Sequence, residues 1–481
     1  MKRIYRTYNK IINPELYENY FHVEDCSGVN NEVILQKLSN VSNSDIDKSP
    51  DINFEYSYDG IQWNSLSPIT SQVTYLTLPA NSKLYLRGNN KRLGIDMYDT
   101  NNKQYICYIN ITCRNEHNIC GNIMSLLYGA KYLDKITFPS NSSLMLYGLF
   151  QDSKTLINAN TLTLPATTLT NYCYQYMFYN CSNLRTSPQI LPALIATNSC
   201  YYSMFQNCTK LMTSPELLAT TLANNCYYGM FSGCSNLTTT VSLPATKLAK
   251  HCYQNMYSNC INLTSTQSSL PATELIDYCY SHMFNGCTKL TRAMSVLPAT
   301  TLAHSCYTNM FSNCTNLKTC PELPATIMVN NCYTNMFSNC KSITATPNLP
   351  GIILADNCYQ SMFSSCINLT QVATILPATT LAPKCYYNMF NSCKSLQIGP
   401  ELPALYLEKN CYQYMFQGCT SLNYIKAYFI EYSNASDEMT NWMYNVAKDG
   451  TFVINPDTKF NPDDIRGTSG IPSNWTVIRT T

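Results

Sequence analysis

The sequence predicts a repeat solenoid built on a parallel sheet, with a small β domain before the repeats and an α+β cap after them. Cysteine pairs recur every 26 or 27 residues, and other residue types keep step with them. A chain of 481 residues is also too long for one compact core, so a repeat array or several domains is expected. Because each coil of a solenoid buries its apolar face only against its neighbours, the array needs a cap at each end.

The cysteine pairs define ten repeats. The first cysteine of each pair lies at 173, 200, 226, 252, 279, 306, 332, 358, 385 and 411, and the second follows eight residues later. Tyr follows the first cysteine in every repeat, and Met lies four residues after it. These fixed positions are expected to form the core, where Cys acts as a small buried apolar residue. We take as representatives Cys173, Cys181, Cys226, Cys234, Cys306, Cys314, Met177, Met230 and Met310.

One repeat divides into three parts. The apolar spacing of Cys226–Phe231 predicts a short helical turn with one buried face. Residues 232–236 are typical of a turn, and the Thr-, Val- and Leu-rich residues 237–243 predict a strand. Pro244 ends this strand because it has no N–H to donate to a ladder. The period lies within the range of leucine-rich repeats.

The amino-acid sequence of the repeat points to a particular family more closely than the repeat length does. Leu-Pro-Ala-Thr-Thr-Leu-Ala at 297–303, followed by Cys-Tyr-Thr-Asn-Met-Phe-Ser-Asn-Cys-Thr-Asn-Leu at 306–317, resembles the BspA-like leucine-rich-repeat proteins of gut Bacteroidetes and their phages. Residues 120–129, 450–453 and 470–477 resemble the flanks of that group. The resemblance covers roughly residues 51–481 and implies a solenoid with a binding role and no chemistry. A virion or fibre protein of a crAss-like phage fits this group.

The flanks lack the repeat and suggest further modules. Asp59-Gly60 between strand-like runs is a hairpin signal. Met145 and Ser153 stand where a first repeat would have its cysteines, and Ser436–Lys448 has the apolar spacing of an amphipathic helix, with two short strands after it. The expected domains are an N-terminal docking segment (1–50), a small antiparallel β domain (51–130), the solenoid with its degenerate first repeat (131–425) and the C-terminal cap (426–481).

The cysteines raise two further questions: whether those near residue 110 bind zinc, and whether those of the repeats form disulfides or bind metal. Cys107, Cys113, His117 and Cys120 have zinc-like residue types, although their spacing matches no common zinc motif closely. Alternation from Cys107 to Cys113 instead predicts one buried strand face, with His117 in a polar loop. We therefore expect no metal and no cofactor. The repeat cysteines are expected to be reduced core columns, with a disulfide framework or metal ligation as the alternatives.

Charge and motif content exclude several classes of function. Lys plus Arg number 31 and Asp plus Glu number 29, so no net field attracts nucleic acid. No run approaches the roughly 18 apolar residues of a membrane-spanning helix, so no membrane insertion is expected. None of the five histidines lies in a recognisable triad context, and no glycine-rich phosphate loop is present. We expect a protein that is not an enzyme.

Binding is expected at the variable positions of the repeat. Repeat proteins bind on extended faces, and a Tyr ring with its hydroxyl suits contact with carbohydrate or protein. For any single residue, simple solvation is the alternative. The candidates are Tyr176, Tyr202, Tyr228, His282, Tyr387 and Tyr414 near the first cysteine, and Arg185, Arg292 and Lys318 on the strand segments.

The first residues carry basic side chains but no apolar run of a secretory signal. We therefore expect a phage virion fibre or decoration protein that is assembled in the host cytoplasm. Residues 1–50 would dock on other virion proteins, and the solenoid would contact host-surface or mucosal glycans or proteins, in a chain that could also form a homo-oligomer. The alternative is a bacterial cell-surface adhesin whose leader has been removed.

Overall fold

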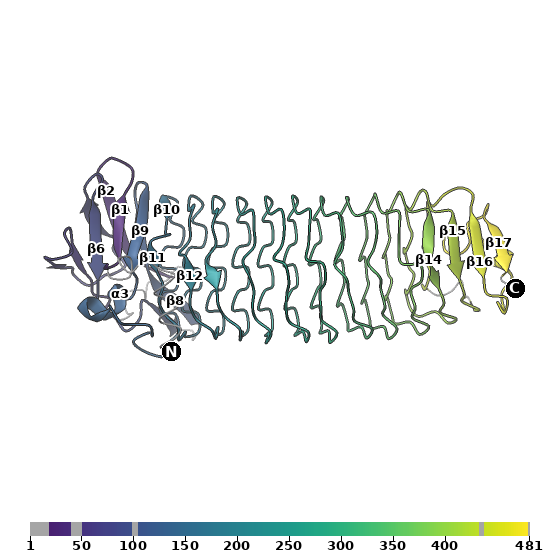
Figure 1. The fold of residues 1–481 in the computed structure, drawn as a ribbon, viewed down its shortest axis with the longest axis horizontal. Coiled ribbons are helices and arrows are strands. Elements are labelled where there is room, and N and C mark those ends of the chain that lie inside the picture. The colour runs from purple at the N-terminus through teal and green to yellow at the C-terminus, as the bar shows by residue number, and fades with distance from the viewer. Residues whose placement is uncertain (1–18, 40–50, 99–103, 432–436, 480–481) are drawn as a thin grey trace. The chain divides into compact units, whose positions relative to one another are not determined.

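The computed structural model describes residues 19–39, 51–98, 104–431 and 437–479. The chain forms two compact units, residues 1–247 and 248–481 (Figure 1). Most of the expected docking segment, residues 1–18 and 40–50, lies outside the described residues. Each unit consists of stacked coils of the repeat, and the first unit also carries the β domain. The expected parallel solenoid class is confirmed.

The β domain consists of two sheets whose strands precede the repeats. One has the order β9-β1-β6-β3-β4 and is extended at β9 by two short strands of the first coil, and the other has the order β5-β2-β8-β7. The strands of the domain are β1 (His22–Asp25), β2 (Asn31–Ser39), β3 (Glu55–Ser57), β4 (Asn64–Ser65), β5 (Thr74–Leu78), β6 (Lys83–Arg87), β7 (Gly94–Tyr98), β8 (Gln104–Cys113) and β9 (His117–Asn122).

The β domain begins earlier in the chain than residue 51. Strand β1 pairs with β6 and β9, and β2 pairs with β5 and β8, all antiparallel. Val33 and Leu35 of β2 are fully buried, as alternation along a half-buried strand requires. Residues 19–39 are therefore part of the β domain and do not form a separate docking segment. The expected hairpin at Asp59-Gly60 is present, with β3 antiparallel to β4 and Gly60 at φ +73°.

Strand β9 connects the antiparallel domain to the parallel repeats. It pairs antiparallel with β1 and parallel with β10 (Leu156–Asn158) and β11 (Leu162–Thr163). Between β9 and β10 lie the short helices α3 (Ser125–Tyr128) and η2 (Gly129–Lys131). The first coil is thus continuous with the sheet of the β domain, which shields its open end from water.

Regular strands are scarce within the repeats. In the described Cys-bracketed repeats of the first unit, β12 (Ile190–Leu191) paired with β13 (Glu216–Leu217) is the only strand pair, and isolated parallel bridges such as Ile195–Thr221 join the other coils. The second unit has similar bridges, for example Val296–Glu322. Residues 237–243, all of which are described, form no regular strand, so the expected strand is reduced to single bridges.

The expected helical turn after the first cysteine is wrong. Its backbone alternates two kinds of hydrogen bond: Tyr174 and Tyr176 donate to the next coil, at the carbonyls of Cys200 and Tyr202, while Met177 donates back to Tyr174. In this segment every fourth residue has a left-handed backbone conformation. These residues lie one before the first cysteine, three after it and seven after it. In the first repeat these residues are Tyr172, Tyr176 and Asn180, with φ of 59°, 57° and 62°.

Columns of identical side chains fill the space inside the coils. In the second unit, Tyr280 stacks on Tyr307 with ring centroids 5.8 Å apart, and Phe311 stacks on Phe337 at 5.6 Å. The cysteine and methionine representatives of both units are 0% exposed. Each coil therefore presents the same apolar groups to the coil before and the coil after it, which accounts for the fixed residues of the repeat.

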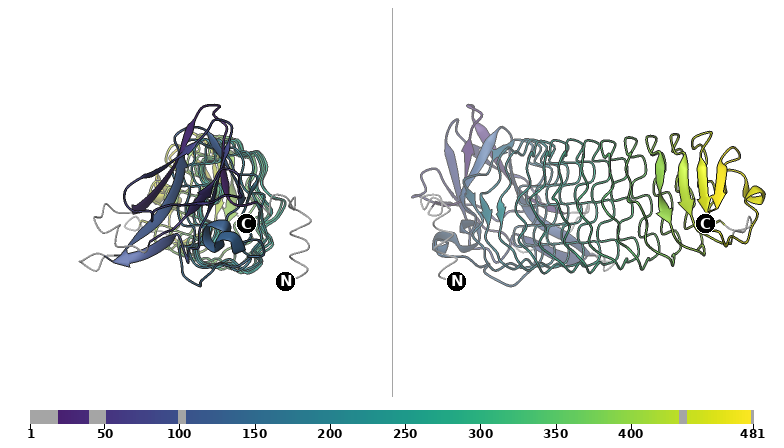
Figure 2. Two further views of the ribbon diagram at one scale, coloured as in Figure 1. Left: turned by 90° about the vertical axis from the view of Figure 1, so that its left-hand side faces the viewer. Right: turned by 45° about the vertical axis from the view of Figure 1, so that its right-hand side comes forward.

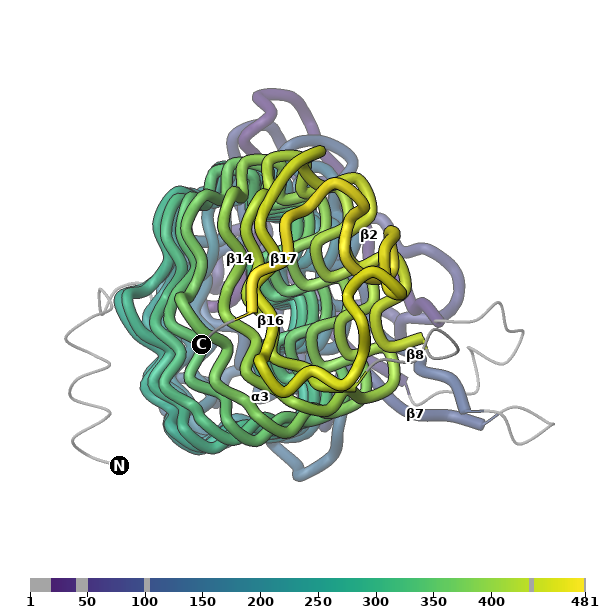
Figure 3. Tube along the Cα trace, turned by 90° about the vertical axis from the view of Figure 1, so that its right-hand side faces the viewer, coloured from purple at the N-terminus to yellow at the C-terminus, as the bar shows by residue number. Residues whose placement is uncertain are grey.

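At the C-terminal end, the last two repeats and the expected cap (426–481) share a four-stranded parallel sheet whose strands lie side by side (Figure 2). Its strands are β14 (Ile398–Leu402), β15 (Tyr424–Ala427), β16 (Thr451–Ile454) and β17 (Thr476–Arg479), with the 3-10 helix η3 (Pro462–Ile465) between the last two. The last coils and β17 close this end in Figure 3. The two strands expected after residue 448 are β16 and β17.

The expected helix at Ser436–Lys448 does not form. Its described part, residues 437–448, is another coil of turns with Asn441 left-handed at φ 51°. The carbonyls of Glu438 and Trp442 accept from the N–H groups of the preceding coil. Trp442 stacks on Tyr412 at 6.0 Å and so covers the end of the tyrosine column.

Candidate binding surface

Three of the six aromatic candidates come together in the first unit. Tyr202 and Tyr228 stack face to face, with centroids 4.6 Å apart and planes 2° from parallel. Tyr176 meets Tyr202 edge-on at 5.6 Å, and Tyr147 meets Tyr176 at 5.6 Å. We call Tyr147, Tyr176, Tyr202 and Tyr228 the tyrosine ladder. The last three are partly buried, so each keeps part of its ring or hydroxyl accessible.

The repeat geometry explains the two kinds of ring contact. Tyr202 and Tyr228 both lie two residues after the first cysteine of their repeats, so successive coils present them in the same orientation. Tyr176 lies three residues after its cysteine, at a left-handed position, and its ring crosses that of Tyr202 at 83°. Edge-to-face and offset contacts are both favourable for aromatic rings.

The inner end of the ladder is anchored on the β domain. Tyr108 of β8 meets Tyr147 at 5.1 Å, and both rings are buried with Leu144. Gly148 is left-handed, and a Cβ there would lie 2.6 Å from the Tyr108 ring. Glycine at this left-handed position of the degenerate repeat therefore allows the Tyr108 ring to pack against the backbone, and a larger residue would not.

The ladder is uncharged and carries hydroxyl groups that can bond a ligand. Two of these hydroxyls belong to Tyr176 and Tyr202, whose side chains are partly buried. Burial raises the pKa of both phenols above its usual value, so they stay neutral at physiological pH. Partly exposed rings beside neutral donors and acceptors can stack on an apolar ligand face and bond hydroxyl groups at its rim.

The remaining aromatic candidates lie in the second unit. Tyr387 and Tyr414 form an edge-to-face pair at 5.6 Å. His282 lies apart from that pair in sequence, and its Nδ1 is 2.8 Å from the Ser281 hydroxyl. Burial lowers the pKa of His282, which favours the neutral imidazole.

A further aromatic run in the second unit was not anticipated from the sequence. His251 stacks on Tyr278 at 4.7 Å, and His304 meets Tyr278 edge-on with its Nε2 2.9 Å from the phenol oxygen. The signal was present, because His251 and Tyr278 both precede the first cysteine of a repeat. It was missed because no residue type recurs at that position through all repeats.

The basic candidates lie on another segment of the coil. Arg185, Arg292 and Lys318 are exposed and follow the leucine that comes after the second cysteine, next to the bridges between coils. Arg185 belongs to the first unit, and Arg292 and Lys318 belong to the second. They are one or two residues from Leu184, Leu290 and Leu317, far along the coil from the tyrosines, so they do not extend the ladder.

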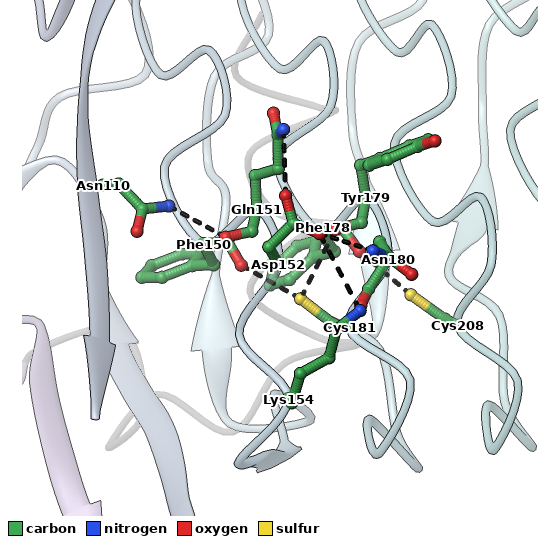
Figure 4. A network of polar contacts seen from close by, with 10 residues as sticks. All are labelled: Asn110, Phe150, Gln151, Asp152, Lys154, Phe178, Tyr179, Asn180, Cys181 and Cys208. Carbon is green, nitrogen blue, oxygen red and sulfur yellow. Dashed lines mark hydrogen bonds and ion pairs between the residues drawn. The ribbon is translucent and has the colours of Figure 1, made fainter. Parts of the chain in front are cut away.

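The cysteine columns have a structural role, because their thiols are buried and bond the backbone of neighbouring coils. All 25 cysteines are free thiols, and all except Cys26 and Cys320 are buried. The thiols of Cys181 and Cys208 donate to the carbonyls of Phe150 and Phe178 in the preceding coil, each at 3.0 Å (Figure 4). In the second unit, Cys314 donates to Phe284 at 3.1 Å. A small side chain with a weak donor fits this position, which explains why Cys recurs there.

The expected zinc-like cluster is not assembled. Cys107 and Cys113 lie on one face of β8, as expected, and both are buried. His117 is the first residue of β9 and is buried, which corrects its expected place in a polar loop. Because His117 and Cys120 are three residues apart on one strand, their side chains leave it on opposite faces. Burial lowers the pKa of His117 to about 4, so it is a neutral core residue.

Comparison with known proteins assigns the repeats to a family. A family model described as the BspA type leucine-rich repeat region matches in six copies over residues 124–229, 226–344 and 281–423. These overlapping stretches run from 124 to 423, which is 300 of the 481 residues. No curated protein matches the chain. None of the helices in the described residues is long and apolar enough to cross a membrane.

Two solved structures are similar over much of the chain. A leucine-rich repeat protein from Bacteroides ovatus ATCC 8483 is 16% identical, with 81% of this chain and 98% of that chain covered and a TM-score of 0.37. A leucine-rich repeat protein of T. pallidum, TpLRR, is 12% identical, with 63% and 88% covered and a TM-score of 0.21.

Proposed function

The chain belongs to the family of BspA-type leucine-rich-repeat proteins, and on that basis we propose a phage virion fibre or decoration protein that binds glycans or proteins of the host surface or the gut mucosa. A leucine-rich-repeat protein of this type is a binding or structural protein. The observation that carries the proposal is the tyrosine ladder, because it is a set of variable residues that the coils gather on one partly exposed surface.

The chemistry of the ladder favours a sugar chain as its ligand. A pyranose ring has one face of C–H groups that can stack on an aromatic ring, and its rim of hydroxyls can bond phenols and amides. Because Tyr202 and Tyr228 cover one face of each other, they repeat their ring edges and hydroxyl groups at the spacing of the coils, while a face not covered by a neighbouring ring can meet a sugar. A chain of sugar rings could therefore run along several coils, with successive contacts adding to the affinity.

The virion assignment is supported by the near-neutral net charge of the chain and by the resemblance of its repeats to phage proteins. Docking on other virion proteins is proposed for residues 1–50, of which 19–39 are built into the β domain. The second candidate is a bacterial cell-surface adhesin, for which the same ladder would bind its ligand.

An antibody against the repeat region distinguishes the two candidates. We expect electron microscopy of purified phage particles to show label at one place on the virion. Label on bacterial cell surfaces, with none on particles, would overturn the virion proposal and favour the adhesin. In that case the ligand-binding role of the ladder would still stand and would be tested separately.

A further inference from the structure

A histidine, a glutamate and a cysteine converge on one sheet of the β domain. His22 of β1 lies directly opposite Cys120 of β9 in the antiparallel ladder, and Glu24 follows two residues later on the same face of β1. The ligand atoms of the three side chains all lie within 4.8 Å of one another. His22 and Cys120 are buried, while Glu24 is partly exposed and so opens the cluster to solvent.

Both ring nitrogens of His22 are hydrogen-bonded. Its Nδ1 lies 2.9 Å from the carbonyl oxygen of Tyr20, which can only accept, so Nδ1 donates there. Its Nε2 lies 3.3 Å from Glu24 Oε1, which also only accepts, so Nε2 donates to the carboxylate and a metal ion would take the place of that proton. A backbone carbonyl that holds the other ring nitrogen is the usual support of a metal-bound histidine. The Tyr85 ring, 4.8 Å away, further limits the motion of the imidazole.

We propose that His22, Glu24 and Cys120 bind one divalent transition-metal ion, with Zn²⁺ the best match. Imidazole, carboxylate and thiolate are all ligands of zinc, whereas Mg²⁺ and Ca²⁺ prefer oxygen alone. Ligand atoms on a tetrahedral zinc are roughly 3.3–3.7 Å apart, given bonds of about 2.0–2.3 Å. The longest separation in the cluster therefore needs to contract by up to about 1.5 Å, and three ligands leave a fourth position open.

Lys83 is the competitor for the carboxylate. Its Nζ lies 2.8 Å from Glu24 Oε1, where it supplies the positive charge that the metal would bring. Half of the Lys83 side chain is exposed, so it can turn into solvent when the metal binds. On binding, the S–H bond of Cys120 and the N–H bond at His22 Nε2 break, Sγ–metal and Nε2–metal bonds form, and both protons pass to the solvent. The dication then faces two anionic ligands and a neutral imidazole, which balances the charge.

The test uses the full-length, reduced protein after treatment with a chelator. Titration with Co²⁺, followed by Zn²⁺ displacement, should show one equivalent of Co²⁺ bound with a thiolate-to-cobalt charge-transfer band. We expect His22→Ala and Cys120→Ala each to weaken Co²⁺ binding at least tenfold and Cys120→Ala to remove the band. Lys83→Met should strengthen binding, because the competing ammonium is gone.

Cys26→Ala is the matched control, since Cys26 lies two residues beyond Glu24 but outside the cluster. It should leave the band and the affinity unchanged. The proposal is overturned if the wild-type protein shows no such band, if Cys120→Ala retains it, or if Lys83→Met binds no more tightly than wild type. Circular dichroism of each variant shows whether a loss of binding reflects loss of the fold. Lys83 is half exposed, so the affinity of Lys83→Met still tests the proposal if a variant of the buried His22 or Cys120 fails to fold.

Discussion

At the scale of the residue, the left-handed positions explain the polar composition of the turns. Asn, Ser and Gly occupy most of these positions, and Asn and Gly tolerate positive φ better than other residues. The sequence showed this enrichment, but the apolar spacing of four residues suited a helix as well. Only the hydrogen bonds to the next coil distinguish the two, and those depend on contacts between residues 26 or 27 apart.

The first prediction concerns Asn335, which is left-handed at φ 54°. Replacing it with Val should lower the free energy of unfolding by about 1–2 kcal/mol, because a β-branched residue is strained in this conformation. Asn335→Gly should change it by less than about 0.5 kcal/mol. Urea unfolding followed by circular dichroism measures both. Equal effects of Val and Gly would contradict the left-handed backbone.

The second prediction compares two tyrosines of the buried column. Among the described residues, the Tyr280 hydroxyl has no hydrogen-bond partner, whereas that of Tyr359 bonds the backbone of Gly351. Tyr280→Phe should therefore be neutral or stabilise the protein by up to about 1 kcal/mol, and Tyr359→Phe should cost about 1 kcal/mol. Thermal unfolding of the two variants side by side tests this. The reverse order of stability would show that the hydroxyls are bonded differently.

At the scale of the element, the coil is held to its neighbour by thiol and backbone hydrogen bonds rather than by a continuous sheet. The sequence predicted the coil, its length and its core positions, since these follow from the recurrence of Cys, Tyr, Met and Leu. It did not predict that the strand would shrink to single bridges or that the cap would repeat the turns. Both depend on how the backbone of one coil fits the next, and no single residue type signals that.

The third prediction tests the second cysteine column. Cys314→Ala should lower the free energy of unfolding by about 1–3 kcal/mol, because the Phe284 carbonyl loses a donor and a small cavity remains. Cys26→Ala should have almost no effect, since Cys26 is exposed. Chemical unfolding in reducing buffer gives both values. If Cys314→Ala lowered the free energy of unfolding no more than Cys26→Ala, the column would have no structural role.

At the scale of the whole molecule, the buried thiols link stability to pH. Burial raises the pKa of eight repeat thiols from 9.0 to about 12, namely Cys181, Cys200, Cys252, Cys306, Cys358, Cys366, Cys411 and Cys419. The unfolded chain loses these protons first as the pH rises, so the native state binds more protons above the unfolded pKa. Stability is therefore complete below about pH 9 and falls from there toward pH 12.

The fourth prediction follows from the number of these groups. Each thiol costs up to about 1.4 kcal/mol per pH unit, so the protein should unfold sharply within about one or two pH units above pH 9. Circular dichroism across a pH series, under anaerobic reducing conditions, shows the transition. A protein that stays folded to pH 11 would contradict the burial of protonated thiols.

The candidate site was predicted in part. Variability along the repeat marked Tyr176, Tyr202 and Tyr228, but it could not show that these three stack together or that Tyr147 extends them. Tyr147 lies in the degenerate repeat, where no cysteine marks its position. His22 and Glu24 lay outside the expected β domain, so their convergence with Cys120 could not be foreseen without the pairing of β1 with β9.

The most direct test of the account is binding of the purified protein to an array of host-surface and mucosal glycans. The wild-type chain should bind a defined set of glycans. The double variant Tyr202→Ser with Tyr228→Ser should bind them at least tenfold more weakly, a loss of about 1.4 kcal/mol or more. Tyr98→Ser, which removes a 60% exposed tyrosine of the β domain, should bind like wild type. Unchanged binding by the folded double variant would contradict the tyrosine ladder as the binding surface.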